Sequence, residues 1–263
     1  MHPTSTVRHE TGSPSPGGDQ AHPGHPRQDR HATPAQSSVH QDDPSARAML
    51  QQAFQRAYRW KADFRGFAAG ASVNQNGRIV EGSITVLPSA EVVVTLPDDH
   101  LRRWVTDTLT AMAITRIHRT FAQAEGQFTL TLGENDRHPF GRLVLLSDTL
   151  ESCYRVKEDR ILQVSRMMGH MKSVINVEDT IRTPDGRHLT TKHIAYSFSS
   201  NNGHLLKAES FTDKHVHVGD AVLPGYRQMV LSEGATVIVR TLTFYGHRML
   251  ENTDGGAAQV ISR

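Results

Sequence analysis

The residues with the clearest chemical potential are histidines near the start of the chain. Residues 1–44 contain six histidines and seven prolines, and almost no apolar side chain larger than valine. The imidazoles of His22, His25 and His31 suit nickel, copper or zinc, but their irregular spacing among prolines and glycines specifies no single site. We predict a disordered, histidine-rich arm. Collection of metal ions by this arm is one hypothesis; the alternative, which we favour, is a solvated segment without metal chemistry.

A second set of metal ligands is predicted near the end of a strand. Asp213, His215 and His217 occupy alternate positions, so in a strand all three side chains face the same side of the sheet. Three such ligands are typical of an open zinc-type site. The alternative, which we favour, is an exposed polar stretch beside the turn at Gly219-Asp220, because the sequence identifies no further ligand on another strand.

Other reactive side chains form no recognisable catalytic arrangement. Met167, Met168, His170 and Met171 could bind copper(I), although methionines are more often flexible core filler or the lining of an apolar cavity. Cys153 lies within a predicted strand and is expected to be unreactive. The sequence contains no nucleophile elbow, zinc-protease, P-loop or dinucleotide-binding motif, so we expect a protein that is not an enzyme.

The elements that must position these residues follow from hydrophobic periodicity. Apolar residues recur at helical spacing over 46–60, with Ser45 as the expected N-cap, and again over 97–117. Period-two alternation and turn residues predict strands elsewhere. The twelve predicted strands cover 67–73, 78–87, 91–96, 127–132, 142–146, 151–156, 160–168, 172–183, 189–199, 205–212, 222–231 and 235–245. This order predicts an α+β fold: one large, curved, half-barrel-like antiparallel sheet packed with two main helices.

Length and composition narrow the remaining choices. The 263 residues divide into the arm (1–44), a single α+β domain (45–250) and a flexible tail (251–263). A net charge of +2 and an aromatic content of 6% argue against nucleic acid as a partner. A single cysteine excludes an internal disulfide. We expect no secretory signal and no membrane span, and hence a cytoplasmic location. The oligomeric state is not predicted.

Several blocks of residues resemble a known family. These are Phe54–Gly66 (FQRAYRWKADFRG), Phe67–Val73, Gly77–Gly82, Ile117–Phe121 (IHRTF), Phe128–Gly133 (FTLTLG), Tyr154–Val156 and Val237–Leu250. Together they span about residues 46–250, and they resemble an uncharacterised domain-of-unknown-function family common in cyanobacteria and plant plastids. The resemblance implies an architecture similar to the periplasmic lipoprotein carriers, in which a half-barrel of antiparallel strands embraces helices and holds acyl chains. The resemblance implies no enzymatic activity or other established function for this chain.

The function predicted from these observations is a soluble, non-enzymatic binding or accessory protein. Its curved sheet would hold a hydrophobic small molecule or a client protein in an apolar pocket. The residues predicted to line that pocket are Phe67, Val93, Trp104, Phe128, Met167 and Tyr196. The alternative is an accessory or maturation factor for a metalloenzyme that handles nickel or copper through the arm. A hydrolase-like enzyme is the third hypothesis.

Overall fold

The computed structural model describes residues 41–251. The predicted metal ligands His22, His25 and His31 therefore lie outside the described residues, as do nearly all of the predicted arm and tail. All statements below concern the described part of the chain.

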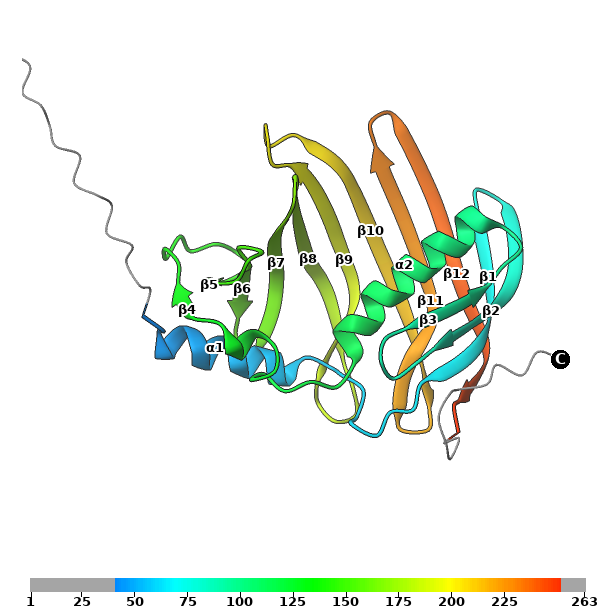
Figure 1. The fold of residues 1–263 in the computed structure, drawn as a ribbon, viewed down its shortest axis with the longest axis horizontal. Coiled ribbons are helices and arrows are strands. Elements are labelled where there is room, and N and C mark those ends of the chain that lie inside the picture. Colours follow the sequence, from blue (N-terminus) through cyan, green and yellow to red (C-terminus); the bar gives the residue numbers. More distant parts are fainter. Residues whose placement is uncertain (1–40, 252–263) are drawn as a thin grey trace, which may run out of the picture. The chain divides into compact units, whose positions relative to one another are not determined.

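One sheet of twelve antiparallel strands forms the fold (Figure 1), and the predicted α+β class with a curved antiparallel sheet is confirmed. The strand order is β3-β2-β1-β12-β11-β10-β9-β8-β7-β6-β5-β4, so β3 and β4 are the two edges and the sheet is not closed. The strands are β1 (Phe67–Gln75), β2 (Arg78–Val86), β3 (Val92–Thr95), β4 (Leu130–Leu132), β5 (Arg142–Leu146), β6 (Cys153–Lys157), β7 (Arg160–Met168), β8 (Met171–Arg182), β9 (His188–Ser199), β10 (Leu205–Val218), β11 (Ala221–Glu233) and β12 (Thr236–Met249).

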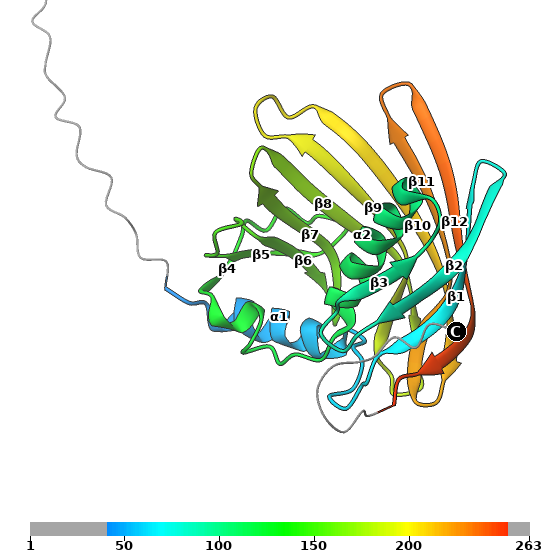
Figure 2. The ribbon, with the colours of Figure 1, turned by 45° about the vertical axis from the view of Figure 1, so that its right-hand side comes forward.

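Two helices accompany the sheet. Helix α1 (Pro44–Arg56) lies beside β4–β7, and α2 (Asp99–Arg116) crosses the concave face in front of β9–β12 (Figures 1 and 2). Among residues 41–251, neither helix combines the length and apolar character that crossing a bilayer requires.

The start and end of α1 differ from the sequence prediction. The N-cap is Asp43, not Ser45: the Asp43 carboxylate accepts hydrogen bonds from the backbone N–H groups of Ser45 and Ala46, and Pro44 occupies the first turn, where it needs no N–H partner. The helix ends at Arg56 because the next residues are extended and the Tyr58 N–H donates to the His188 carbonyl of β9.

Each helix has its own hydrophobic core. Helix α2 packs with β1–β3, β11 and β12 around Trp60, Phe67 and Leu109, all of which are nearly inaccessible to solvent. Helix α1 packs with β4–β6 around Leu50 and Leu130. The region of the concave face between the two helices is covered by neither core.

Register decides which side chains face that region. Pairing along the sheet places Val164 opposite Ile175 on the inner face. Successive side chains of a strand alternate between the two faces, so Asn176, next to Ile175, points to the outer face. The residues paired with it across the sheet share that face; they are Ile194, Ser210, Val230 and Val239.

Candidate ligand-binding cavities

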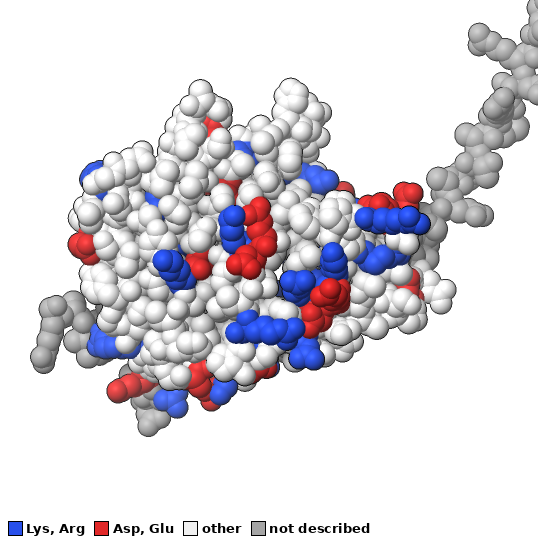
Figure 3. Space-filling view, turned by 180° about the vertical axis from the view of Figure 1, so that it is seen from behind, with Lys and Arg blue, Asp and Glu red and all other residues white. Residues whose placement is uncertain are grey.

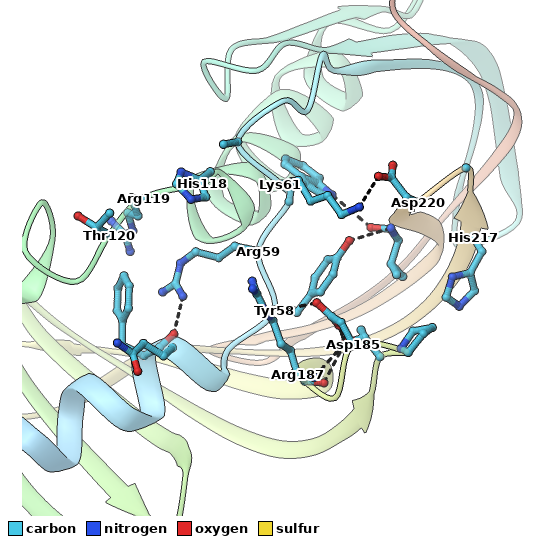
Figure 4. A pocket seen from close by; sticks show the side chains of 18 of the residues that line it. Tyr58, Arg59, Lys61, His118, Arg119, Thr120, Asp185, Arg187, His217 and Asp220 are labelled. Atoms are coloured by element: carbon cyan, nitrogen blue, oxygen red, sulfur yellow. Dashed lines mark hydrogen bonds and ion pairs between the residues drawn. The ribbon is translucent and has the colours of Figure 1, made fainter.

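A cavity of about 740 Å³, called the large cavity below, opens where four loops meet (Figure 4). They are the segment after α1, the segment after α2, the β8–β9 turn and the β10–β11 turn. Two of its charged pairs are satisfied within the rim: Lys61 lies 2.6 Å from Asp220, and Arg187 lies 3.2 Å from Asp185. These four side chains are largely exposed, so the pairs contribute little to stability.

Two aromatic residues fix the segment after α1 against β11. The Tyr58 hydroxyl accepts a hydrogen bond from the Val222 N–H at 2.8 Å, and the Trp60 indole donates to the Val222 carbonyl at 3.2 Å. The N–H and the carbonyl of Val222 are thus hydrogen-bonded to Tyr58 and Trp60, the residues before and after Arg59. This holds the Arg59 backbone in a fixed position at the cavity wall.

A smaller cavity, of about 260 Å³, lies under both helices against β6–β9. The aliphatic part of its wall comes from the end of α2 and from the inner face of the sheet. Its members are Ile114, Ile161, Val164, Ile175 and Val177. Ile114 is 47% exposed and Ile175 is 36% exposed, although both point toward the interior of the curved sheet. The two cavities adjoin, because Phe54, Tyr58, Arg59 and Arg119 contribute to both walls.

Arg59 is the most unusual residue at this junction. Its side chain is buried, its guanidinium stacks 3.6 Å from the centre of the Phe54 ring, and it donates to the Phe54 carbonyl at 2.6 Å. Burial lowers the pKa of Arg59 to about 10, and the nearby positive charge of Arg119 acts in the same direction. The group remains charged at neutral pH.

The buried carboxylate of Glu125 lies near two other arginines of the junction, Arg119 and Arg166. Glu125 accepts a hydrogen bond from the Tyr154 hydroxyl at 2.9 Å, and it lies 3.7 Å from Arg119 and 3.9 Å from Arg166. Arg166 also donates to the Tyr154 hydroxyl at 2.6 Å. Burial raises the pKa of Tyr154, and the neighbouring Glu125 raises it further, so this phenol stays protonated and acts as a donor to the carboxylate.

A second polar cluster lies on the concave face near the end of α2. Asp213 on β10 accepts two hydrogen bonds, each 2.7 Å long, from Arg227 on β11. Arg116 of α2 lies 3.3 Å from the Nε2 of His215. Burial lowers the pKa values of His193 and His215 to about 4, helped by the neighbouring arginines, so both imidazoles are neutral at pH 7.

The predicted metal set Asp213, His215 and His217 is not assembled as a ligand group. Asp213 is engaged by Arg227, His215 lies beside Arg116, and His217 is exposed at the large cavity. Within residues 41–251, no group of three or more His, Cys, Asp or Glu side chains is arranged to hold a metal ion.

The six residues predicted to line an apolar pocket are separated by the structure, and none lines either cavity. Phe67 and Trp104 pack in or against the α2 core, and Phe128 packs against the α1 core. Val93 is 38% exposed at the edge strand. Met167 and Tyr196 belong to the outer face, because their neighbours Arg166 and Ala195 share the inner face with Val164 and Ile175.

The remaining reactive residues flank strand ends. Met168 and Met171 close the turn between β7 and β8, and Met168 is 53% exposed, so it is not the core filler expected from sequence. Cys153 is half-buried, and burial raises the pKa of its thiol, in keeping with an unreactive cysteine.

Sequence reasoning missed the arginines that surround the junction. The signal was present in the pattern: Arg59 stands between Tyr58 and Trp60, both of which are buried, and Arg116 is the buried last residue of the amphipathic helix α2, three positions before Arg119. A charged residue whose neighbours in the sequence are buried is expected to be buried as well, which is unusual for an arginine.

Comparison with known proteins gives a family but no activity. None of the curated proteins is similar enough to match the chain. A LolA superfamily protein from Nitrosomonas europaea aligns with 10% identity and a TM-score of 0.36, covering 80% of this chain and 95% of its own. A domain from Vibrio parahaemolyticus, named for outer membrane lipoprotein sorting, aligns with 9% identity and the same TM-score, covering 80% and 94%. The family model described as "Protein of unknown function (DUF3386)" matches residues 41–250, and the chain belongs to that family.

Proposed function

We propose that this protein binds an apolar or amphiphilic small molecule in the small cavity between α1, α2 and strands β6–β9. The observation that carries the proposal is the solvent-accessible aliphatic surface inside the curved sheet. Ile114 and Ile175 are among the more exposed large apolar residues of the described chain, yet both line a concave cavity and do not lie on the outer surface. Covering such surface with an apolar ligand is favourable by roughly 25 cal/mol per Å².

The cavity also has the composition of a small-molecule site. Ligand pockets are concave, mostly apolar, and contain a few polar groups that orient the ligand. The 260 Å³ space has an aliphatic wall on the sheet side and arginines near α1, and it shares wall residues with the large cavity. The gap between the two hydrophobic cores positions this space, since each helix covers only its own end of the sheet.

The test compares two substitutions of equal exposure on opposite faces of the sheet. Ile175 is 36% exposed on the inner face, and Val239 is 37% exposed on the outer face. The full-length protein is titrated with the neutral apolar fluorophore N-phenyl-1-naphthylamine. We expect saturable binding that Ile175→Asn weakens at least fivefold and that Val239→Asn leaves unchanged.

Two results would contradict the proposal. The first is the absence of saturable probe binding by protein whose circular dichroism and thermal melting show that it is folded. The second is equal weakening by both substitutions, which would place the probe on apolar surface in general. Native mass spectrometry of protein purified from its own host supplies an independent readout, since a retained small molecule adds a defined mass.

A further inference from the structure

The wall of the small cavity contains more arginines than carboxylates. Five arginines line it, against two carboxylates, Glu125 and Asp159, and one of the five, Arg160, is paired at 3.5 Å with Glu158 outside this wall. Asp159 is already engaged by His188 at 3.1 Å and by Arg56 at 3.8 Å. Glu125 is therefore the one carboxylate of this wall that is directed at its arginines.

Arg59 makes no hydrogen bond or close ion pair with that carboxylate, whose charge acts on it only from a longer distance. Its side chain is 9% exposed, and within residues 41–251 no carboxylate oxygen lies within 4.0 Å of its guanidinium. Its Nε is buried and has no hydrogen-bond partner. A buried charge without a counter-ion and a buried donor without an acceptor both cost free energy. A ligand that supplies an acceptor here therefore gains more binding free energy than one that makes the same hydrogen bond at the surface.

Arg119 directs a second unmet donor to the same place. Its Nε is buried without a partner, and its guanidinium carbon lies 5.8 Å from the centre of the Phe54 ring on which Arg59 also stacks. Both guanidiniums therefore lie near one ring, and each is of the kind that pairs with a carboxylate or phosphate through two parallel hydrogen bonds. The opposite side of the sheet does not share this imbalance: Figure 3 shows Lys and Arg lying beside Asp and Glu there, as in the 3.0 Å pair of Lys192 and Glu178.

The two arginines also define a direction for the ligand. Both line each cavity, whereas Ile161, Val164 and Ile175 line only the small one. An anion held at the junction therefore has aliphatic surface on one side and the open, polar cavity on the other. Figure 4 shows Arg59 and Arg119 on the wall of the large cavity, away from the Lys61–Asp220 pair.

We propose that the ligand is an anionic amphiphile, whose acidic head group pairs with Arg59 and Arg119 while its alkyl chain lies in the small cavity against β7 and β8. This inference rests on the proposed function and specifies the class of ligand. A carboxylate and a phosphate monoester share the required chemistry. The buried Oε2 of Glu125, which has no partner, accepts a hydrogen bond from a head group that carries a hydroxyl.

The test separates head-group recognition from binding of the chain. Dodecanoate, dodecyl phosphate and the neutral 1-dodecanol are each titrated against probe-loaded full-length protein at pH 7.5, below their aggregation concentrations. We expect at least one of the two anions to displace the probe at a concentration at least tenfold lower than dodecanol does. The anion that does so identifies the head group.

Variants of two arginines supply the control. Arg119→Gln removes a side chain that is 32% exposed, and we expect it to reduce affinity for the preferred anion about tenfold while leaving dodecanol unchanged. Arg187→Gln removes another arginine of the large cavity, whose guanidinium is already paired with Asp185, and we expect no change for any ligand. Arg59→Met, which keeps an unbranched side chain on the Phe54 ring, should abolish the preference for anions.

The outcomes distinguish the two proposals. Equal binding of dodecanol and both anions, unaffected by Arg119→Gln, overturns this inference and leaves the proposed function intact. An equal effect of Arg119→Gln and Arg187→Gln also overturns it, because a general electrostatic effect would then explain the preference. Failure of all three ligands and of the probe to bind folded protein overturns the proposed function itself. If Arg59→Met does not fold, the comparison of Arg119→Gln with Arg187→Gln decides alone.

Discussion

Substitution of Asp213 by asparagine should destabilise the fold by about 3 kcal/mol or more. The Asp213 and Arg227 side chains are only 6% and 7% exposed, and two hydrogen bonds of 2.7 Å join them across β10 and β11. Removing one partner of a buried ion pair typically costs roughly 3–5 kcal/mol, because the other charge is left uncompensated. Here the loss also affects Arg116, which is buried in the same cluster and interacts favourably with the Asp213 charge.

Urea unfolding followed by circular dichroism measures this loss. The control is Glu178→Gln, which breaks the 3.0 Å pair with Lys192 on the outer face, where the two side chains are 34% and 48% exposed. Such a surface pair contributes about 1 kcal/mol or less. The double substitution of Asp213 by leucine and Arg227 by methionine should regain part of the stability lost in Asp213→Asn, since Arg227 no longer leaves an uncompensated buried charge, whereas Arg116 still loses its favourable interaction with Asp213. If Asp213→Asn costs no more than Glu178→Gln, the reasoning about this pair is wrong.

Three further predictions follow from local features. Stability should fall by roughly 5 kcal/mol between pH 6.5 and pH 4, about half of it from each histidine, because the unfolded chain takes up protons on His193 and His215 that the folded chain, with pKa values of about 4, does not; a flat stability curve over this range would refute it. Asp43→Ala should lower the unfolding free energy by about 1 kcal/mol and Ser45→Ala by much less, and the reverse order would restore Ser45 as the cap. Gly66→Ala should cost more than about 1 kcal/mol by urea unfolding, because the residue has φ +92° and its Cβ would meet a main-chain oxygen of β2; an unchanged midpoint would contradict this.

The elements of this fold were predictable because they depend on neighbouring residues. All twelve predicted strands overlap an observed strand, and the Asn76-Gly77 pair forms the turn between β1 and β2, as its left-handed conformations require. The extent of α1 was not predictable in the same way. Its periodic pattern continues to Trp60, but the chain leaves the helix at Ala57 to pair with His188, more than a hundred positions away.

The site depended on information that local patterns lack. Predicting that Met167 and Tyr196 line a pocket requires knowing which face of each strand is concave, and the β-bulges of the sheet shift this alternation. The aliphatic residues that do line the small cavity, such as Val164 and Ile175, have sequence surroundings like those of the outer-face residues. The arginines were not singled out from the sequence, because charged residues usually lie at the surface.

The contrast between two buried arginines is the strongest argument for a ligand at the junction. Arg227 and Arg59 are both almost inaccessible, yet Arg227 is matched by a bidentate aspartate and Arg59 only by a backbone carbonyl and an aromatic ring. Where a buried guanidinium has a structural role, as in Arg227, the sheet therefore supplies a carboxylate to pair with it. Arg59 instead has a donor without a partner on the wall of a cavity, and the neighbouring guanidinium of Arg119 repels it. An arrangement that costs stability in the empty protein is explained when an anion completes it.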